Sequence, residues 1–313
     1  MASIDMPAKK VEHKREAIQW EPIIFHTINY ALLILLCVLM VYPMLNTLAL
    51  SFNEGMDAVR GGIRLWPRIF TLENYQVVFA RQSIQIGMRV SVMRTVVSVV
   101  TNILVTSMLA FALSRPEFVF RKFISLAFVV TMYLQVGLIP WFILNNNILG
   151  MGGTFAVYWV PTMISAFNLI VIRTYMKSVS ESLVESARLD GASDFRIYAQ
   201  IIMPLCKPTL ATIALFVAVG AWNAWFDAFI FNSGSPQWTV LQFELMTVLN
   251  QAMMAGMTGG AAQAVAGGGA GSMVTPGAIR AAITVVAAVP ILLVYPFMQR
   301  YFVHGIQLGG VKE

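Results

Sequence analysis

Long apolar runs with few charges alternate along the chain with shorter segments that are polar or rich in glycine. A helix rises about 1.5 Å per residue, so about 20 apolar residues are enough to cross the roughly 30 Å hydrocarbon core of a bilayer. Runs of this length predict transmembrane helices rather than one buried core. The pattern therefore predicts an all-α membrane protein with six transmembrane helices, at about residues 24–50, 90–113, 123–144, 154–174, 208–231 and 279–299.

Composition excludes most other classes of protein. Of the 313 residues, 58% are hydrophobic and 12% are charged, against roughly 25% charged residues in an average soluble domain. The two cysteines, Cys37 and Cys206, lie far apart in or beside apolar runs, which indicates neither a disulfide framework nor a metal site. The net charge of +6 comes without a basic stripe interleaved with aromatic residues, so we expect no nucleic-acid partner.

Lysine and arginine set the expected orientation, because the short cytoplasmic flanks of membrane helices are enriched in both. Most of these residues fall in the flanks at 1–23, 114–122, 173–207 and 300–313. Both termini are therefore expected to face the cytoplasm. About 20 polar residues precede the first apolar run, so this run is expected to be a membrane helix and not a cleaved signal peptide.

Two outside connections have a character of their own. Residues 51–89 carry five arginines, and because long connections follow the charge rule poorly, we expect a small extracytoplasmic cap with an interfacial helix near Leu72–Ala80. Residues 256–277 hold eight glycines, which favours a flexible outside loop. The expected division is a cytoplasmic N-terminal segment 1–23, a six-span domain 24–300 and a cytoplasmic tail 301–313.

The segment between the fourth and fifth spans, residues 178–208, is amphipathic within an otherwise apolar chain. Gly191 predicts the end of a first helix, because glycine readily adopts the left-handed backbone of a helix C-terminus. Ser193 or Asp194 can cap a second helix, which Pro204 and Pro208 would bring to an end. The pair is either an interfacial connection that ties two spans together or a knob that docks into a groove on a cytoplasmic partner.

The spacing within this segment favours docking. It resembles the E-A-A-x3-G-x9-I-x-L-P signature of permease subunits of binding-protein-dependent ABC importers, with departures at Ser186, where Ala is usual, and Met203, where Leu is usual. Other motifs are similar to the carbohydrate branch of that family, and above all to the maltose-type second permease. They are Ser51-Phe52-Asn53, Thr71-Leu72-Glu73-Asn74-Tyr75, Leu113-Ser114-Arg115, Trp222-Asn223 and Gly309-Gly310-Val311-Lys312.

The resemblance implies a type I ABC importer permease fold, with cytoplasmic coupling helices between spans 4 and 5, in a bacterial cytoplasmic membrane. It implies no catalytic residues and no cofactor in this chain, because ATP and Mg²⁺ would be used by partner subunits. The sequence contains no Gly-x4-Gly-Lys-Ser/Thr loop, in agreement with this. The expected partners are a second, larger permease, two ATPase subunits, an extracytoplasmic sugar-binding protein and the carbohydrate itself.

The resemblance also gives each residue of the coupling segment an expected role. Glu185 would form an ion pair with the ATPase, and Gly191 would form the turn. The tail from Gly309 to Lys312 would contact the ATPase, or it is a frayed terminus. The positions expected to contact the ATPase or to brace the two helices are Glu185, Ser186, Ala187, Leu189, Gly191, Phe195, Ile201 and Pro204.

Polar residues within the spans are costly and therefore informative. Asp227 is four residues after Asn223, so in one continuous helix the two would share a face. Together with Trp222 and Trp225 they form a candidate surface of the substrate pathway. The alternatives are hydrogen bonds to the partner permease and hydration of Asp227 near the outer interface. Arg94, one turn into the second span, is expected to extend outward to the interface.

Two other functions compete with the importer interpretation. A stand-alone secondary transporter would show paired broken helices in two halves and ionisable relays within its spans. A non-transporting membrane scaffold would give no reason for the glycine-punctuated helix pair. The branch resemblance favours an oligosaccharide or a fragment of a polysaccharide as the substrate.

Overall fold

The computed structural model describes residues 20–134, 136–257 and 274–307, and nearly all regular structure in these residues is helical. One isolated antiparallel bridge joins Asn53 to Phe70. The α-helices are α1 Trp20–Ser51, α2 Gly55–Val59, α3 Glu73–Ala80, α4 Gln82–Ser114, α5 Arg121–Tyr133, α6 Leu138–Phe142, α7 Ala166–Ser178, α8 Glu181–Leu189, α9 Asp194–Ile197, α10 Met203–Leu205, α11 Lys207–Asn223, α12 Phe226–Asn232, α13 Leu241–Met257 and α14 Pro276–Gln307. Two π-helical turns, η1 Ile143–Ile148 and η3 Tyr198–Ile202, and two 3-10 turns, η2 Phe155–Tyr158 and η4 Pro236–Trp238, complete the set.

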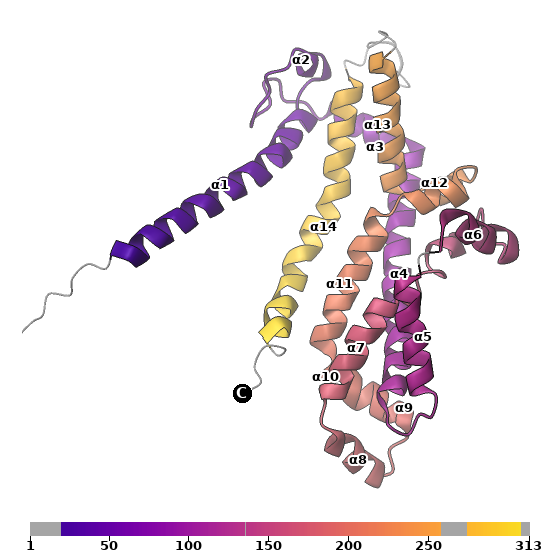
Figure 1. Ribbon diagram of the computed structural model, residues 1–313. Helices are drawn as coiled ribbons and strands as arrows, with labels where there is room; N and C mark the ends of the chain where they lie inside the picture. Colours follow the sequence, from indigo (N-terminus) through magenta and orange to yellow (C-terminus); the bar gives the residue numbers. More distant parts are fainter. Residues whose placement is uncertain (1–19, 135, 258–273, 308–313) are drawn as a thin grey trace, which may run out of the picture.

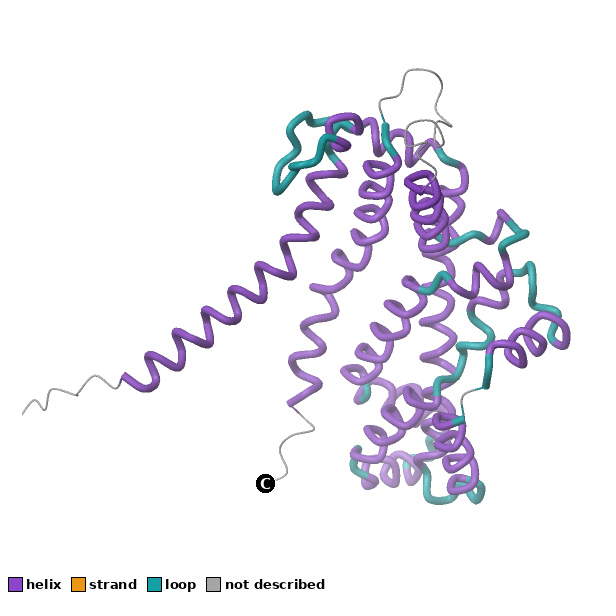
Figure 2. Tube along the Cα trace, turned by 45° about the horizontal axis from the view of Figure 1, so that its top comes forward, coloured by secondary structure: helices purple, strands orange, loops and turns teal. Residues whose placement is uncertain are grey.

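The first helix diverges from a bundle formed by the other long helices (Figures 1 and 2). α1 packs on α14 near the small helix α2, and further toward its N-terminus it extends away from the body. Most of its apolar side chains are exposed. In a bilayer, such side chains face lipid or another subunit.

Three helices of the described chain are long and apolar enough to cross a membrane: Ile24–Ser51, Gln82–Ser114 and Pro276–Pro296. A fourth span is possible if the pair Asp194–Leu205 and Lys207–Asn223, bent by 81°, counts as one. The other expected spans, 123–144, 154–174 and 208–231, consist of shorter helices joined by irregular segments. The count of six spans therefore stays a prediction.

Two of the interruptions have a cause in the local sequence. Gly137 precedes α6 and Pro140 lies in its first turn, where the missing amide prevents the helix from continuing back toward α5, and Pro161 lies between η2 and α7. A proline removes a backbone donor and disfavours a helical conformation in the residue before it. α7 then starts at a regular cap, since the Ser165 hydroxyl accepts a hydrogen bond from the backbone amide of Asn168.

The carbonyl groups freed by the second interruption find partners on α4. The Asn102 side chain donates to the Thr162 carbonyl at 2.8 Å, and the Thr106 hydroxyl donates to the Met163 carbonyl at 3.2 Å. The side-chain amide of Asn168 also donates to the side-chain oxygen of Asn102 at 3.2 Å. Irregular backbone at membrane depth needs such partners, because no water is present in the hydrocarbon region to satisfy it.

α4 is the central element of the bundle and packs against α7, α11 and α13. One of its faces is buried and carries small or polar residues. Small side chains let neighbouring backbones approach closely, and polar ones satisfy groups on the neighbouring segments. The residues of this face are Gly87, Ser91, Arg94, Ser98, Asn102 and Thr106.

A compact cap follows the first helix and lies beside the start of α14 (Figure 1). The Arg68 guanidinium pairs with the Asp57 carboxylate at 3.0 Å, and the Asn53 amide donates to the same carboxylate at 3.0 Å. The hydrogen bond from Asn53, together with Arg68, lowers the pKa of Asp57. The helix expected near Leu72–Ala80 is α3.

Candidate functional site

The segment singled out by its spacing forms a helix–turn–helix, which we call the coupling hairpin (residues 180–205). α8 ends at Leu189, and Gly191 follows two residues later with a φ of 77°, in the left-handed region. The amides of Gly191 and Ala192 donate to the carbonyls of Arg188 and Ala187, each at 3.0 Å, and close the helix end. The Ser193 hydroxyl then caps the second helix by accepting from the Arg196 amide. Both the predicted turn and a predicted cap are present, and the second helix ends at Leu205, between Pro204 and Pro208.

The residues expected to dock divide into a buried set and an exposed set. Ala187 is buried against the core of the bundle, so it braces the hairpin and offers no free surface. Leu189 is 90% exposed and Phe195 is 67% exposed, and Glu185 is exposed beside them on the same hairpin. Large apolar side chains left in solvent at such a turn are typical of an interaction surface. Of the other expected positions, Ser186, Gly191 and Pro204 are exposed and Ile201 packs partly on the core.

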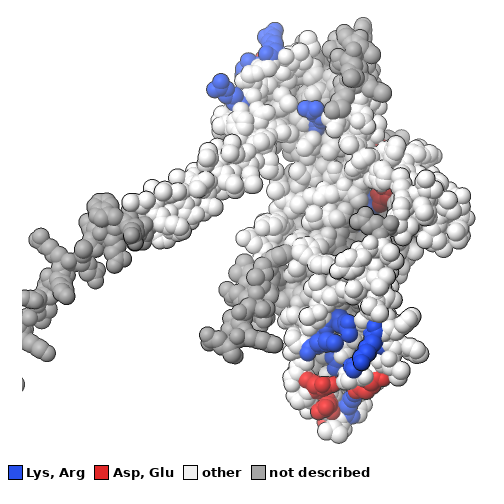
Figure 3. Space-filling view, viewed as in Figure 1, with Lys and Arg blue, Asp and Glu red and all other residues white. Residues whose placement is uncertain are grey.

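Arg188 connects the hairpin to the segment that follows α4. Its guanidinium pairs with Glu117, in the connection after α4, and with Asp194 at 3.2 Å. The hydrogen bond from Arg188 lowers the pKa of Glu117, and the same bond raises the pKa of Arg188. The lower end of the molecule accordingly shows neighbouring acidic and basic surfaces (Figure 3).

The C-terminal half of α4 holds the hairpin through further contacts. The hydroxyls of Ser107 and Tyr198 share a buried hydrogen bond of 2.7 Å, and the ring of Tyr198 packs on that of Phe111 with centroids 5.6 Å apart. The Arg115 guanidinium lies 5.0 Å from the centre of the Phe111 ring. A cavity of about 460 Å³ lies between these groups and Phe195. The hairpin is therefore attached to α4 by both polar and aromatic contacts.

The four residues of the candidate pathway do not form one surface. The helix is interrupted at Ala224 and Trp225, so the prediction that Asn223 and Asp227 share a helical face is wrong. Asn223 is exposed at the end of α11. Trp222 is buried, and its indole donates to the Ala287 carbonyl at 2.9 Å.

Asp227 is paired within the chain, with the arginine that was expected to extend outward. Arg94 is only 3% exposed, and the prediction that it reaches the interface is wrong. Its guanidinium forms an ion pair with the Asp227 carboxylate and donates to the Ala224 carbonyl at 3.0 Å. It also lies over the Tyr158 ring, 4.6 Å from the centroid. The sequence held a signal for this pair, because opposite charges within spans usually pair with one another.

Aromatic side chains gather on the other side of α12. The ring centroids of Trp225 and Phe226 are 5.7 Å apart, and those of Phe229 and Phe243 are 6.2 Å apart. Phe226 and Phe229 are exposed. Trp225, the predicted pathway residue, therefore belongs to an aromatic cluster rather than to a polar one.

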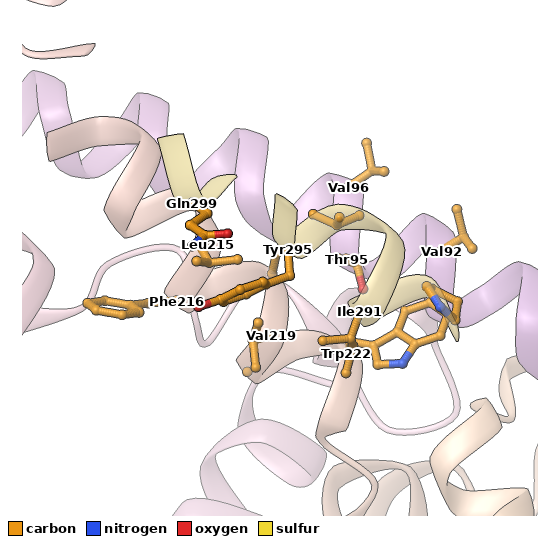
Figure 4. A pocket seen from close by; sticks show the side chains of 14 residues that line it. Val92, Thr95, Val96, Leu215, Phe216, Val219, Trp222, Ile291, Tyr295 and Gln299 are labelled. Atoms are coloured by element: carbon orange, nitrogen blue, oxygen red, sulfur yellow. The ribbon is translucent and has the colours of Figure 1, made fainter. Parts of the chain in front are cut away.

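A cavity of about 1040 Å³ opens between α4, α11 and α14 (Figure 4). Its walls are mostly apolar, with Val92, Leu215 and Ile291 among them, and Trp222 lies at one end. Tyr295 and Gln299 of α14 lie together near Leu215 in the same view. In addition to the aromatic cluster, this cavity is a second place where the bundle offers an apolar surface to another molecule.

Several expected positions lie outside the described residues. These are the tail contact at Gly309, Gly310, Val311 and Lys312, residues 1–19 of the N-terminal segment and residues 258–273 of the glycine-rich loop. Within the described residues, no three His, Cys, Asp or Glu side chains lie close enough to hold a metal ion. Cys37 is exposed and Cys206 is buried, and both are free thiols.

Comparison with known proteins decides the family. A family model described as "Binding-protein-dependent transport system inner membrane component" matches residues 86–308. The chain belongs to this family. Its members are transport permeases and not enzymes, and the family is a component of the inner membrane.

Relatives of the permease cover nearly its whole length. It is 33% identical over 292 residues to the polygalacturonan/rhamnogalacturonan transport system permease protein YtcP of Bacillus subtilis, covering 92% of this chain and 98% of that one. It is 26% identical to the arabinooligosaccharides transport system permease protein AraQ of Halalkalibacterium halodurans, covering 91% and 95%. The resemblance to carbohydrate-importer permeases is thus confirmed.

A solved structure has the same fold. It is a bacterial ABC transporter involved in the import of the acidic polysaccharide alginate, and one of its chains matches the permease with a TM-score of 0.79 at 28% identity, covering 89% of this chain and 96% of that one. The expected all-α, type I importer permease fold is confirmed. The interruptions described above are therefore features of a multi-pass membrane protein.

Proposed function

We propose that the permease forms half of the translocation pathway for a carbohydrate, paired with a second, larger permease. Two cytoplasmic ATPase subunits would drive it, and an extracytoplasmic binding protein would deliver the sugar. Oligosaccharides or polysaccharide fragments are the substrate class that its relatives support. The named substrates of two of them, polygalacturonan and alginate, are acidic glycans.

The observation that carries this proposal is the coupling hairpin. Leu189 and Phe195 are large, apolar and exposed, while Val184 and Ala187 on the opposite side of the hairpin are buried. Burying one leucine or phenylalanine side chain contributes about 1.5–3 kcal/mol. Glu185 is placed to add an ion pair with a basic residue of the ATPase.

ATP would act on the permease mechanically. Closure of the ATPases would carry the hairpin with them and shift the pathway from inward-open to outward-open. To convert a 1:99 population into 99:1, nucleotide must favour one state by about 5.5 kcal/mol. The rigid attachment of the hairpin to α4 supports this scheme, because a loosely tethered knob would not transmit such a bias.

The scheme fixes the orientation of the chain. A hairpin that docks on an ATPase lies in the cytoplasm, and the distribution of lysine and arginine puts both termini on that side as well. We propose that the tail from Gly309 to Lys312 contacts the same ATPase. Asn223 and Trp225 remain the candidate pathway residues with exposed surface, whereas Trp222 and Asp227 have partners within the chain.

Co-purification tests the proposal. The permease is co-expressed with a second permease and an importer ATPase from the same organism, and recovery of the ATPase is measured for the native chain and for Leu189→Asp. We expect the native chain to retain the ATPase and the variant to lose it. Retention by both, or labelling of residues 178–208 by a membrane-impermeant reagent from outside the cell, would contradict the assignment.

A further inference from the structure

The interruption between α11 and α12 is unusual in its chemistry. In a continuous helix, the amide of Ala228 would donate to the carbonyl of Ala224. Here the Ala224 carbonyl accepts from Arg94 at 3.0 Å, and the Ala228 amide donates to the Asp227 carboxylate at 2.9 Å. The acceptor and the donor of the missing helical hydrogen bond are therefore each satisfied by one member of the same ion pair.

Neither proline nor glycine explains this interruption. The sequence from Trp222 to Ala228 contains neither residue and includes two alanines, which are strong helix formers. Ala224 nevertheless has an extended backbone, with φ −74° and ψ 126°. The local sequence would permit a helix, and the side chain that contacts the interruption comes from α4.

The same pair ties three irregular segments to α4. Asp227 lies in the first turn of α12, and Tyr158, beneath the Arg94 guanidinium, ends η2. The Tyr158 hydroxyl in turn donates to the carbonyl of Trp238, which ends η4. In Figure 3 the surface midway between the two charged ends is almost free of charge, apart from one small acidic spot. A charge pair in such surroundings is costly to separate, because few groups are available to replace either partner.

α4 also carries the attachment of the coupling hairpin. Arg94 and Ser107 lie about 20 Å apart along this one helix, at about 1.5 Å per residue. Ser107 shares a hydrogen bond with Tyr198 of the hairpin, and Arg94 forms an ion pair with Asp227 beside the interruption. A continuous helix of 33 residues thus has a fixed contact to the hairpin toward one end and to α12 toward the other.

We propose that Arg94 is a positioning residue, and that its pair with Asp227 keeps the fifth span interrupted and makes α12 follow α4 when the coupling hairpin moves. The inference rests on the proposed function, since it needs an ATPase that moves the hairpin. Without the pair, the Ala224 carbonyl and the Ala228 amide are free to bond one another. α12 would then join α11 as one helix and lose its connection to α4.

A double variant separates this role from simple stabilisation. Removing one partner would leave a buried charge, whereas Arg94→Met with Asp227→Leu removes both charges and keeps most of the volume, so the chain is expected to fold. The matched control is Arg68→Gln with Asp57→Asn, which removes the ion pair of the cap. Each is reconstituted in the complete transporter in liposomes, and uptake of a size-fractionated polygalacturonan digest is measured together with ATP hydrolysis.

We expect the Arg94/Asp227 variant to assemble and hydrolyse ATP, with uptake per ATP reduced about tenfold, within the range typical of coupling between sites. The cap control should keep the native ratio. Native uptake per ATP in the Arg94/Asp227 variant would overturn the inference. Absence of ATP-driven uptake by the native complex for this digest and for an alginate digest would instead count against the proposed function.

A distance measurement decides the inference without a substrate. Spin labels are placed at Val96 of α4 and Phe229 of α12, both exposed, in a chain with Cys37 and Cys206 replaced by alanine. In the native pair background we expect one narrow distance distribution, unchanged between the nucleotide-free and the ATP-trapped complex. The double variant should give a shifted or broadened distribution. The same narrow distribution in both backgrounds would overturn the inference.

Discussion

The Ser91 hydroxyl of α4 accepts a hydrogen bond of 2.9 Å from the backbone amide of Leu241, the first residue of α13. Four residues earlier, Gly87 lies against the same backbone, since a Cβ there would be 3.1 Å from the Leu241 nitrogen and the Val240 carbonyl carbon. The N-terminal end of α4 and the start of α13 are thus held at a distance that only a small residue allows.

Gly87→Ala should destabilise the permease, because the neighbours that would have to move are backbone atoms of Val240 and Leu241. We expect a loss of about 1–3 kcal/mol, as for other overpacked sites. Thermal unfolding in detergent measures it. Gly220→Ala is the matched control within α11, because a Cβ at Gly220 meets nothing within 4 Å. A drop in stability for both variants alike would mean that the close approach is not the cause.

Removing one partner of the hydrogen bond between Ser107 and Tyr198 should lower the free energy of unfolding more than removing both partners. Tyr198→Phe leaves a buried hydroxyl at Ser107 without this partner, which costs about 1–3 kcal/mol. Adding Ser107→Ala should recover part of the loss, since no buried polar group is then orphaned. Unfolding of the two single variants and the double variant gives the coupling energy. Strictly additive losses would show that the two hydroxyls do not interact.

Gly191→Pro should uncouple the transporter while leaving the chain inserted in the membrane. The φ of 77° at Gly191 is closed to proline, whose ring fixes φ near −65°. The turn of the hairpin must then rearrange, and Leu189 and Phe195 lose their relative placement. Uptake and surface expression are measured together. Normal uptake by this variant would contradict the docking role of the hairpin.

The sequence predicted the hairpin well because its turn is determined locally. Gly191 and Ser193 act within a few residues, so spacing alone placed both helices. The interruption at Ala224 could not be predicted in this way, because its stabilising partner, Arg94, is more than a hundred residues away in the chain. The expected shared face of Asn223 and Asp227 failed for the same reason, since it assumed that local helix propensity decides the backbone.

The direction of the apolar α1 is a second feature that local reasoning leaves open. Hydropathy predicted a spanning helix there, and the helix is present. Whether it packs on its own bundle depends on the neighbours it meets, and the run of apolar residues looks the same in either case. Periodicity identifies a buried face only where a polar face contrasts with an apolar one. α8 has this contrast, whereas the buried face of α4 itself carries polar residues.

The ion pair between Arg188 and Glu117 should make the attachment of the hairpin depend on pH. The hydrogen bond from Arg188 lowers the pKa of Glu117 in the folded chain. The stabilising contribution is therefore present above the ordinary pKa of a glutamate, about 4.3, and is lost as pH falls through the lowered folded value.

Glu117→Gln should lower stability at neutral pH and flatten the pH dependence in the acid range, by a small amount because the pair is exposed. Protease cleavage within residues 178–208, followed from pH 7 downward, measures this opening. An unchanged pH profile in Glu117→Gln would show that the pair with Glu117 does not attach the hairpin, because the other partner of Arg188, Asp194, belongs to the hairpin itself.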